Sequence, residues 1–252
     1  MIDLAYKGHV AILKMTHGKA NAMDLALCEA MVKRLDQVLS SSARAVVITG
    51  QGNIFSAGVD LVRALDGGPD YFRQFLPQLR RMFEAVFFYE KPMVAAVNGH
   101  AIAGGCVLAC AADRALMAQG TGRIGITELL VGVPFPVIAL EIVRFAAAPD
   151  RFEGMVTSGA TFPPEAAVGL GLIDEVVPAD ALIDQAIAAA EALAALGADA
   201  FALTKRQTRQ PAKERLERDG PLFDPAVDAV WTAPETAARI RDYVTRTFKK
   251  MS

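Results

Sequence analysis

The first hundred residues alternate between short apolar runs and segments with helical spacing. Residues 2–6 and 10–15 are rich in apolar and β-branched side chains and flank a Lys-Gly pair, which predicts a hairpin. Asp24 can cap a helix, because apolar side chains recur at helical spacing over residues 27–39. Residues 45–49 form a continuous apolar run before a glycine, which indicates a buried strand. This alternation of strands and helices favours an α/β fold.

The unit of strand, glycine loop and helix recurs later in the chain. Residues 93–97 form a second buried apolar run, which leads through Asn98-Gly99 into a helix of small residues. A short strand is expected near residues 114–117. The prolines at 163 and 164 predict a helix start, and two glycines close that helix before a strand over residues 173–177.

The last quarter of the chain is predicted to be helical throughout. An alanine-rich amphipathic helix is expected over residues 179–196, and the pattern after it stays helical. We place a boundary near Gly197, with a core of residues 1–197 and a C-terminal helical region of residues 198–252. This region is expected to serve oligomerisation and to cover the active site.

Composition favours a small-molecule enzyme over a nucleic-acid or membrane protein. The 252 residues can bury a sizeable core. The 26 basic and 28 acidic residues give a formal charge of -2, so no overall field attracts nucleic acid or an anionic membrane. A hydrophobic content of 53% suggests additional apolar surface between subunits, and we expect an oligomer.

Cysteine and histidine usage points to a reducing compartment without a metal. Three cysteines do not form a disulfide pattern, and three histidines show no zinc-ligand spacing. Residues 1–10 contain an early acid and lack the regions of a signal peptide, so a cytoplasmic location is expected. The apolar stretch 93–118 contains polar residues and glycines, and we interpret it as core.

Several common catalytic signatures are absent from the sequence. There is no phosphate-binding Gly-x-x-x-x-Gly-Lys, no Gly-x-Ser-x-Gly elbow and no His-Glu-x-x-His, and Gly50-Gln51-Gly52 lacks the third glycine of a dinucleotide fingerprint. Nucleotide hydrolysis, serine hydrolysis and zinc proteolysis are therefore disfavoured.

Two glycine loops that follow the buried strands are the remaining candidates for chemistry. Gly58 would let the backbone turn so that the amide of Val59 points outward, and the amide of Gly104 would lie at a helix start, where N–H groups lack acceptors. Two such donors can form an oxyanion hole, and each is worth on the order of 3 kcal/mol when charge develops on a carbonyl oxygen. The glycines alone are equally consistent with tight helix–strand packing.

Three ordered motifs resemble the crotonase superfamily, the enoyl-CoA hydratase/isomerase family. They are FSAGVDL at residues 55–61, NGHAIAGGC at 98–106 and IGITE at 124–128. KANAM at residues 19–23 resembles the family's early CoA-contacting segment, and FPPEA at 162–166 with GLIDEVV at 171–177 resembles its late signature. The resemblance runs from residue 10 to about residue 177.

The resemblance implies a spiral of ββα units and a homotrimer or dimer of trimers. It also implies an acyl-CoA thioester whose carbonyl oxygen meets the Val59 and Gly104 amides. Coenzyme A would enter as part of the substrate, with no tightly bound cofactor. The residues expected to contact it are Lys19, Ala20, Ala57, Asp60 and Leu61, although Asp60 also fits a loop-stabilising role.

The chain departs from the family hydratases at one acidic position. Those enzymes carry a glutamate three residues after the second oxyanion glycine, where this chain has Val107; their other acid matches Glu128. Hydration needs two acids, whereas isomerisation of a 3-enoyl-CoA to a 2-enoyl-CoA needs one base. Residues 124–135 resemble the mitochondrial-type Δ3,Δ2-enoyl-CoA isomerases, so Glu128 is the expected base, and Val107 is expected to keep the pocket dry.

Alternatives remain for the reaction and for the other polar residues. The chain could hydrate an enoyl-CoA or hydrolyse a thioester through Glu128 or Glu141, or bind acyl-CoA or RNA without catalysis. Glu141 is interpreted as an ion-paired or interface residue, and Glu128 could simply complement its helix start. The basic run 205–218 is expected to be a solvated helix face. Packing is expected for Cys106 and Cys110, a core position for His100 and a surface loop for His17.

Overall fold

The computed structural model describes residues 1–249, which form ten strands and ten helices. The strands are β1 (Ile2–Lys7), β2 (Val10–Met15), β3 (Ala45–Thr49), β4 (Ile54–Ser56), β5 (Met93–Val97), β6 (His100–Ile102), β7 (Arg114–Ala118), β8 (Ile124–Gly125), β9 (Thr161–Phe162) and β10 (Glu175–Val177). The helices are α1 (Leu25–Leu39), α2 (Leu61–Phe87), α3 (Gly104–Cys110), α4 (Glu128–Val131), α5 (Val137–Ala146), α6 (Phe152–Ser158), α7 (Pro164–Gly169), α8 (Leu182–Ala194), α9 (Ala198–Thr232) and α10 (Pro234–Lys249).

The strands form two sheets that the chain visits alternately. The larger sheet has the order β1-β2-β3-β5-β7-β10 and is parallel except for the β1–β2 hairpin. The smaller sheet has the order β4-β6-β8-β9. Each of β3, β5 and β7 is followed by a strand of the smaller sheet and then by a helix, so three ββα units succeed one another. This arrangement confirms the predicted spiral of ββα units.

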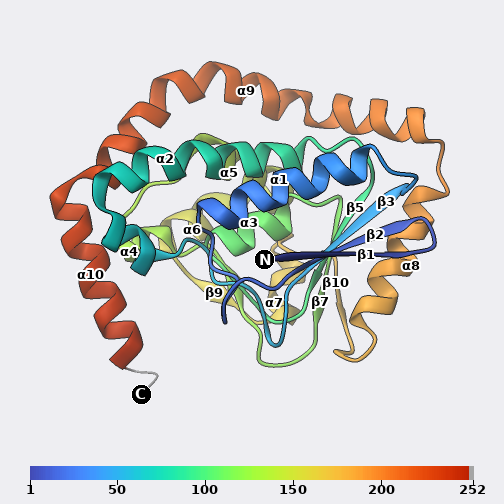
Figure 1. Ribbon diagram of the computed structural model, residues 1–252, viewed down its shortest axis with the longest axis horizontal. Helices are drawn as coiled ribbons and strands as arrows, with labels where there is room; N and C mark the ends of the chain where they lie inside the picture. The colour runs from blue at the N-terminus through green and yellow to red at the C-terminus, as the bar shows by residue number, and fades with distance from the viewer. Residues whose placement is uncertain (250–252) are drawn as a thin grey trace.

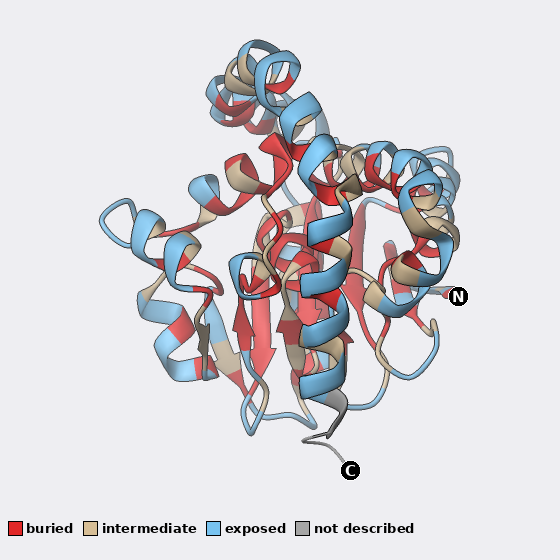
Figure 2. Ribbon diagram, turned by 90° about the vertical axis from the view of Figure 1, so that its left-hand side faces the viewer, coloured by how far each residue is buried: buried red, intermediate tan, exposed pale blue. Residues whose placement is uncertain are grey.

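Helices cover both faces of the larger sheet, whose central strands β3, β5 and β7 are almost entirely buried (Figure 2). One face carries the main hydrophobic cluster together with α1, α2, α3 and α5, and the other face packs against α8. Because apolar runs such as β3 and β5 face helices on both sides, they have no polar alternation.

The predicted hairpin and first helix are confirmed. β1 and β2 pair antiparallel from Ile2 opposite Met15 to Lys7 opposite Val10. The Oδ1 atom of Asp24 accepts the amide of Leu27 at 2.8 Å and caps α1.

Two predicted elements are shorter than expected for local reasons. The strand predicted over residues 173–177 begins only at Glu175, because the Asp174 carboxylate accepts the Ala115 amide at 2.7 Å in place of a backbone carbonyl. The helix predicted over residues 179–196 begins at Leu182, because Ala181 closes a turn onto Pro178 first.

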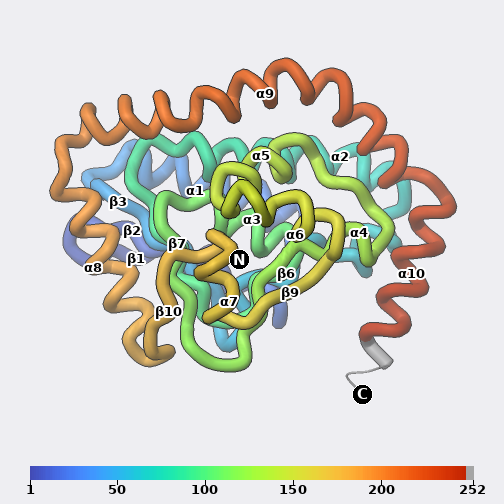
Figure 3. Tube along the Cα trace, turned by 180° about the vertical axis from the view of Figure 1, so that it is seen from behind, coloured from blue at the N-terminus to red at the C-terminus, as the bar shows by residue number. Residues whose placement is uncertain are grey.

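The two C-terminal helices wrap around the core. α9 runs along the top of the molecule over α2 and α5, and α10 then descends along one side (Figure 1), as the view from behind also shows (Figure 3). α9 begins at Ala198 directly after Gly197, where the boundary was placed, but its buried apolar side chains Ala212, Val227 and Trp231 belong to the main hydrophobic cluster. Residues 250–252 of the predicted helical region lie outside the described residues.

Within residues 1–249, no single helix is long and apolar enough to cross a membrane. The pair α8 and α9, with a bend of 100° between the two helices, is long and apolar enough when judged by length and composition alone.

Candidate active site

The first glycine loop is held so that the amide of Val59 stays free. Val59 forms a parallel bridge with Met23, in which Met23 donates to the Gly58 carbonyl at 2.7 Å and Asp60 donates to the Met23 carbonyl at 2.9 Å. These bonds use the groups on either side of Val59, and across residues 1–249 its own N–H has no recorded acceptor. The predicted outward-pointing donor is therefore consistent with the backbone geometry.

The second loop meets the first at Gly58. This glycine has a φ of +81°, and a Cβ atom added there would lie 2.8 Å from the Cβ of Ala103 and 3.1 Å from the amide nitrogen of Gly104. Only glycine permits both this conformation and this approach. The loops that carry the Val59 and Gly104 amides are thus in direct contact.

The Gly104 amide follows a strained residue. Ala103 has φ 53° and ψ −123°, a region that non-glycine residues rarely occupy. Gly104 is the first residue of α3, so its N–H has no intrahelical acceptor, and none is recorded for it within residues 1–249. An added Cβ on Gly104 would lie 2.9 Å from the sulfur of Met23, which explains the need for glycine.

A buried asparagine supports the first loop. The side-chain amide of Asn21 donates to the backbone carbonyls of Ile54 and Phe55 at 3.2 and 3.1 Å. The backbone carbonyl of Asn21 accepts the Ser56 hydroxyl at 2.8 Å. Asn21 has a φ of 46°, which asparagine tolerates better than most residues. The sequence analysis gave Asn21 no such role, although an asparagine between two alanines was a possible signal.

Within residues 1–249, one buried side-chain polar atom lacks a hydrogen-bond partner, and this atom belongs to Glu128. As a residue it is partly exposed, but its Oε2 atom is shielded from solvent and unpartnered. Burial raises the pKa of this carboxyl to about 7, against smaller opposing effects of nearby backbone amides. A carboxyl that titrates near neutral pH suits a general base.

Glu128 shares one narrow pocket with both glycine loops. The pocket is lined by Ala57, Val59, Leu61, Ile102, Ala103, Thr127, Glu128, Val131, Val133, Trp231 and Tyr243. Most of these side chains are apolar, so charge formed inside the pocket would interact chiefly with Glu128 and the free amides. The structure therefore brings Glu128 and Val59 together and places Gly104 directly behind Ala103.

Two walls of this pocket come from the C-terminal helical region, which was expected to cover the active site, but the sequence analysis named neither residue. They are Trp231, near the end of α9, and Tyr243 on α10. The indole N–H of Trp231 donates to the Pro134 carbonyl at 2.9 Å, which fixes the ring. The only signal in the sequence was that Trp231 is the single tryptophan of the chain.

Val107 lies in the core and does not line the pocket. It is fully buried on α3 within the main hydrophobic cluster. The residues that line the pocket include Ile102 and Ala103 but not Val107, so the expected effect of Val107 on water in the pocket stays a prediction. An apolar residue at position 107 nevertheless leaves Glu128 as the acid that lines the pocket.

Of the residues expected to contact coenzyme A, Ala57 and Leu61 line the pocket. The Ala20 carbonyl accepts the Ala57 amide at 3.0 Å, so this segment adjoins the pocket, whereas Lys19 is exposed. Asp60 accepts the Arg63 amide at 3.0 Å and caps α2, as the loop-stabilising interpretation required.

Glu141 is ion-paired, as interpreted from the sequence. Its two carboxylate oxygens meet Arg144 at 3.1 Å and Arg215 at 2.6 Å, and the residue is only 4% exposed. It does not line the pocket that contains Glu128. It therefore joins α5 to α9 and has no free carboxylate oxygen for catalysis.

The remaining candidate residues are two cysteines and two histidines, and their surroundings are typical of structural residues. Cys106 and Cys110 are buried, and interaction with Cys110 together with burial raises the pKa of the Cys106 thiol, so a reactive thiolate is disfavoured. His17 Nε2 lies 3.0 Å from the buried carboxylate of Asp24. His100 is half-buried on β6 and is not the core histidine that was expected. Among residues 1–249 no group of three metal-ligating side chains comes together.

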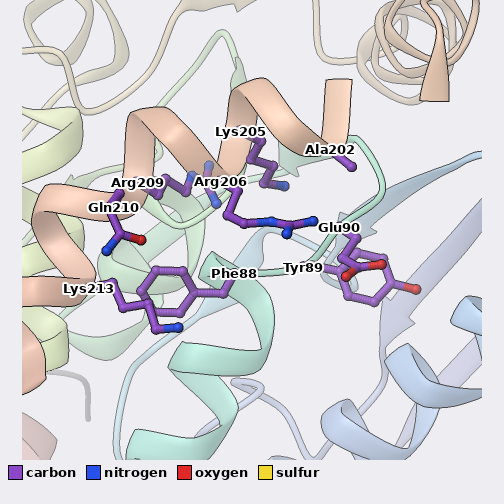
Figure 4. A pocket seen from close by; sticks show the side chains of 9 residues that line it. All are labelled: Phe88, Tyr89, Glu90, Ala202, Lys205, Arg206, Arg209, Gln210 and Lys213. Atoms are coloured by element: carbon purple, nitrogen blue, oxygen red, sulfur yellow. The ribbon is translucent and has the colours of Figure 1, made fainter. Parts of the chain in front are cut away.

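A second, basic pocket lies at the far end of α2 (Figure 4). Two of its cations, Lys205 and Arg209, are buried and pair with Asp113 at 2.7 and 2.9 Å. The expectation of a wholly solvated basic face is therefore wrong for these two, because α9 turns them into the core. Their charge is used within the fold, because both cations pair with the carboxylate of Asp113.

The alternating sheets and the three ββα units define the crotonase fold. A model of the family described as enoyl-CoA hydratase/isomerase matches residues 5–221, and the chain belongs to this family within the crotonase superfamily. It therefore belongs among enzymes that act on acyl-CoA thioesters, generally without a tightly bound cofactor.

Relatives within the family carry different activities in their names. A Thermus thermophilus protein named "Putative enoyl-CoA hydratase" is 34% identical over 205 residues, 79% of this chain and 80% of its own. Human mitochondrial enoyl-CoA delta isomerase 1 is 26% identical over 210 residues, 82% of this chain and 70% of its own. The crystal structure of human mitochondrial delta3-delta2-enoyl-CoA isomerase superposes with a TM-score of 0.94 at 23% identity, covering 100% of this chain and 99% of the other.

Proposed function

We propose that the protein isomerises 3-enoyl-CoA thioesters to trans-2-enoyl-CoA thioesters. The observation that carries the proposal is the carboxyl of Glu128, which has a buried Oε2 atom without a partner and a pKa raised to about 7, in a pocket with no second acid among its lining residues. A proton shuttle needs one group that both accepts and returns a proton near neutral pH, and Glu128 has these properties.

The proposed reaction uses Glu128 and the two amides in turn. The Glu128 carboxylate takes a proton from C2, and the electron pair moves onto the thioester oxygen, where the Val59 and Gly104 amides stabilise it. The resulting dienolate then takes the proton from Glu128 at C4, so the double bond moves from C3–C4 to C2–C3 and the carboxylate is restored. Each donor contributes on the order of 3 kcal/mol at the charged stage.

The substrate would enter from the side of the first glycine loop. Ala57 is exposed at the pocket mouth, and Ala20 and Lys19 lie beside it, which suits the coenzyme A portion. Leu61 would then contact the substrate near the thioester, and Asp60 would hold the loop through its helix cap. Trp231 and Tyr243 support the proposal that the C-terminal region covers the site of its own chain.

A homotrimer or dimer of trimers is the expected assembly. Leu203, Leu222, Phe223 and Val230 on α9 are exposed, which leaves apolar surface available for contact between copies. Light scattering that gives a monomer mass at micromolar concentration would contradict this assembly.

The test is an assay of 3-enoyl-CoA thioesters with the wild-type protein and with Glu128→Gln. Turnover by the wild type that is lost in the variant, while coenzyme A thioesters still bind, supports the mechanism. Full activity in the variant rejects it.

Enoyl-CoA hydration is the second candidate, because the Thermus relative at 34% identity carries a hydratase name. It predicts a 3-hydroxyacyl-CoA product from 2-enoyl-CoA and water. Formation of that product faster than isomerisation would favour hydration.

A further inference from the structure

Two pockets share one wall. Trp231 lines the pocket with Glu128, and the same residue lines a second pocket. The second pocket is lined mainly by apolar groups of α2 and of the α9–α10 junction, among them Ala64, Phe72 and Ala237. Of the residues that line the two pockets, Trp231 is the one common to both, so it lies between the proposed reaction site and a further apolar space or at its edge.

Helix α2 runs along both pockets. Leu61, its first residue, lines the pocket with Glu128, and Ala64 and Leu65 line the second pocket about 5 Å further along the helix axis. The helix is interrupted at Gly68, with φ 62° and ψ −161°, and a Cβ added there would meet nothing within 4 Å. The interruption leaves open space beside the second pocket.

Trp231 is a fixed wall. It is only 2% exposed, its indole N–H donates to the Pro134 carbonyl at 2.9 Å, and its ring packs against Phe72 with centroids 5.4 Å apart. A side chain held by one hydrogen bond and one aromatic contact does not swing aside without losing both.

The direction of the substrate brings its acyl end to this wall. With coenzyme A on the Ala57 side and the reacting carbons at Glu128, the acyl chain extends toward Leu61, Val131 and Trp231. This step rests on the proposed function.

We propose that Trp231 limits the enzyme to short acyl chains, and that the second pocket is a latent subsite for the distal part of longer chains. Removal of the indole joins the two pockets. Each further CH2 group that leaves water then improves binding by about fourfold.

The test compares kcat/KM for 3-hexenoyl-CoA and 3-dodecenoyl-CoA. The wild type is expected to favour the hexenoyl substrate at least tenfold. Trp231→Ala is expected to raise the ratio of dodecenoyl to hexenoyl efficiency at least tenfold, and adding Ala237→Phe to that variant refills the second pocket and reverses the gain. Equal efficiency of the wild type with both substrates, or an unchanged ratio in folded Trp231→Ala, overturns the proposal.

A matched control is Val227→Ala, which removes a buried side chain from the same helix but lines neither pocket. Its ratio is expected to equal that of the wild type, and a rise equal to that of Trp231→Ala overturns the proposal. If Trp231→Ala does not fold, Trp231→Phe serves instead. Its ratio of dodecenoyl to hexenoyl efficiency is expected to rise by a smaller factor, and an unchanged ratio overturns the proposal that Trp231 separates the two pockets.

Calorimetric binding of hexanoyl-CoA and dodecanoyl-CoA separates the two proposals. Tighter dodecanoyl-CoA binding by Trp231→Ala, with no isomerisation by any variant, supports the partition and rejects the proposed function. If isomerisation depends on Glu128 but binding does not depend on chain length in any variant, the role of Trp231 is rejected and the proposed function stands.

Discussion

The protein buries two glutamates in opposite ways. Glu141 places its carboxylate between two arginines, whereas Glu128 has a shielded oxygen with no partner. Buried charge is costly unless it is paired, so the first arrangement stabilises the fold and the second costs stability. The difference teaches that the unsatisfied group, rather than the buried acid as such, marks the candidate catalytic residue.

The largest difference between Glu128 and Glu141 should appear in catalytic activity. Glu128→Gln removes the proposed base, so kcat for 3-enoyl-CoA isomerisation is expected to fall by about 10³- to 10⁴-fold. Glu141→Gln, measured in the same steady-state assay, should stay within about threefold of the wild type. A comparable loss in both variants would remove the distinction.

The pH profile is the second contrast. Since the pKa of Glu128 is raised to about 7, kcat/KM should increase about tenfold per pH unit from pH 5 and level off above pH 7. Glu141→Gln should keep this profile, measured with a substrate that does not titrate in the range. A profile flat from pH 5 to pH 8 would contradict the assignment of the base.

Stability should respond to Glu141 with a smaller effect. Glu141→Ala leaves Arg144 and Arg215 without their partner, which is expected to lower the free energy of unfolding by about 1–3 kcal/mol. Urea titration measures the change. The exposed pair Lys213–Glu217 supplies the control, since Glu217→Ala should change the free energy by less than about 0.5 kcal/mol.

The smallest effect should be a gain of stability in Glu128→Gln. The folded state holds the Glu128 proton up to about pH 7, whereas the unfolded carboxyl loses it near its ordinary value of 4.5. Wild-type stability from this group is thus full below pH 4.5 and is lost as the pH rises through 7. Glu128→Gln should be more stable by about 1–2 kcal/mol at pH 8 and similar to the wild type at pH 4.5. Lower stability of the variant at pH 8 would show that the carboxylate is solvated.

Local sequence signals predicted the elements whose causes are local. The apolar runs of β3 and β5, the Asp24 cap and the glycines at 58 and 104 each depend on a few neighbouring residues, and they were predicted correctly. The strands of the smaller sheet span two or three residues, too few to show a period.

The part of the site that could not be predicted depends on distant contacts. Trp231 lines the same pocket as Leu61 and Glu128 because α9 crosses the molecule over α2 and α5, and spacing along the chain does not show which residue of α9 reaches the pocket. In the same way Lys205 and Arg209 belong to a basic surface run by sequence, while the fold brings Asp113, about a hundred residues earlier, between them. Pairing across such separations is set by packing, which one sequence does not display.

The hydrogen bond from Arg209 to Asp113 joins residues 96 positions apart, and such long-range contacts affect when the site becomes complete during folding. The glycine loops and Glu128 lie within the first 128 residues, whereas Trp231 and Tyr243 are synthesised about a hundred residues later. Contacts of this sequence separation form late, after the costly closure of a long loop. A nascent chain therefore carries the proposed donors and base before the walls supplied by Trp231 and Tyr243 are present, and these walls form only after α9 and α10 have docked.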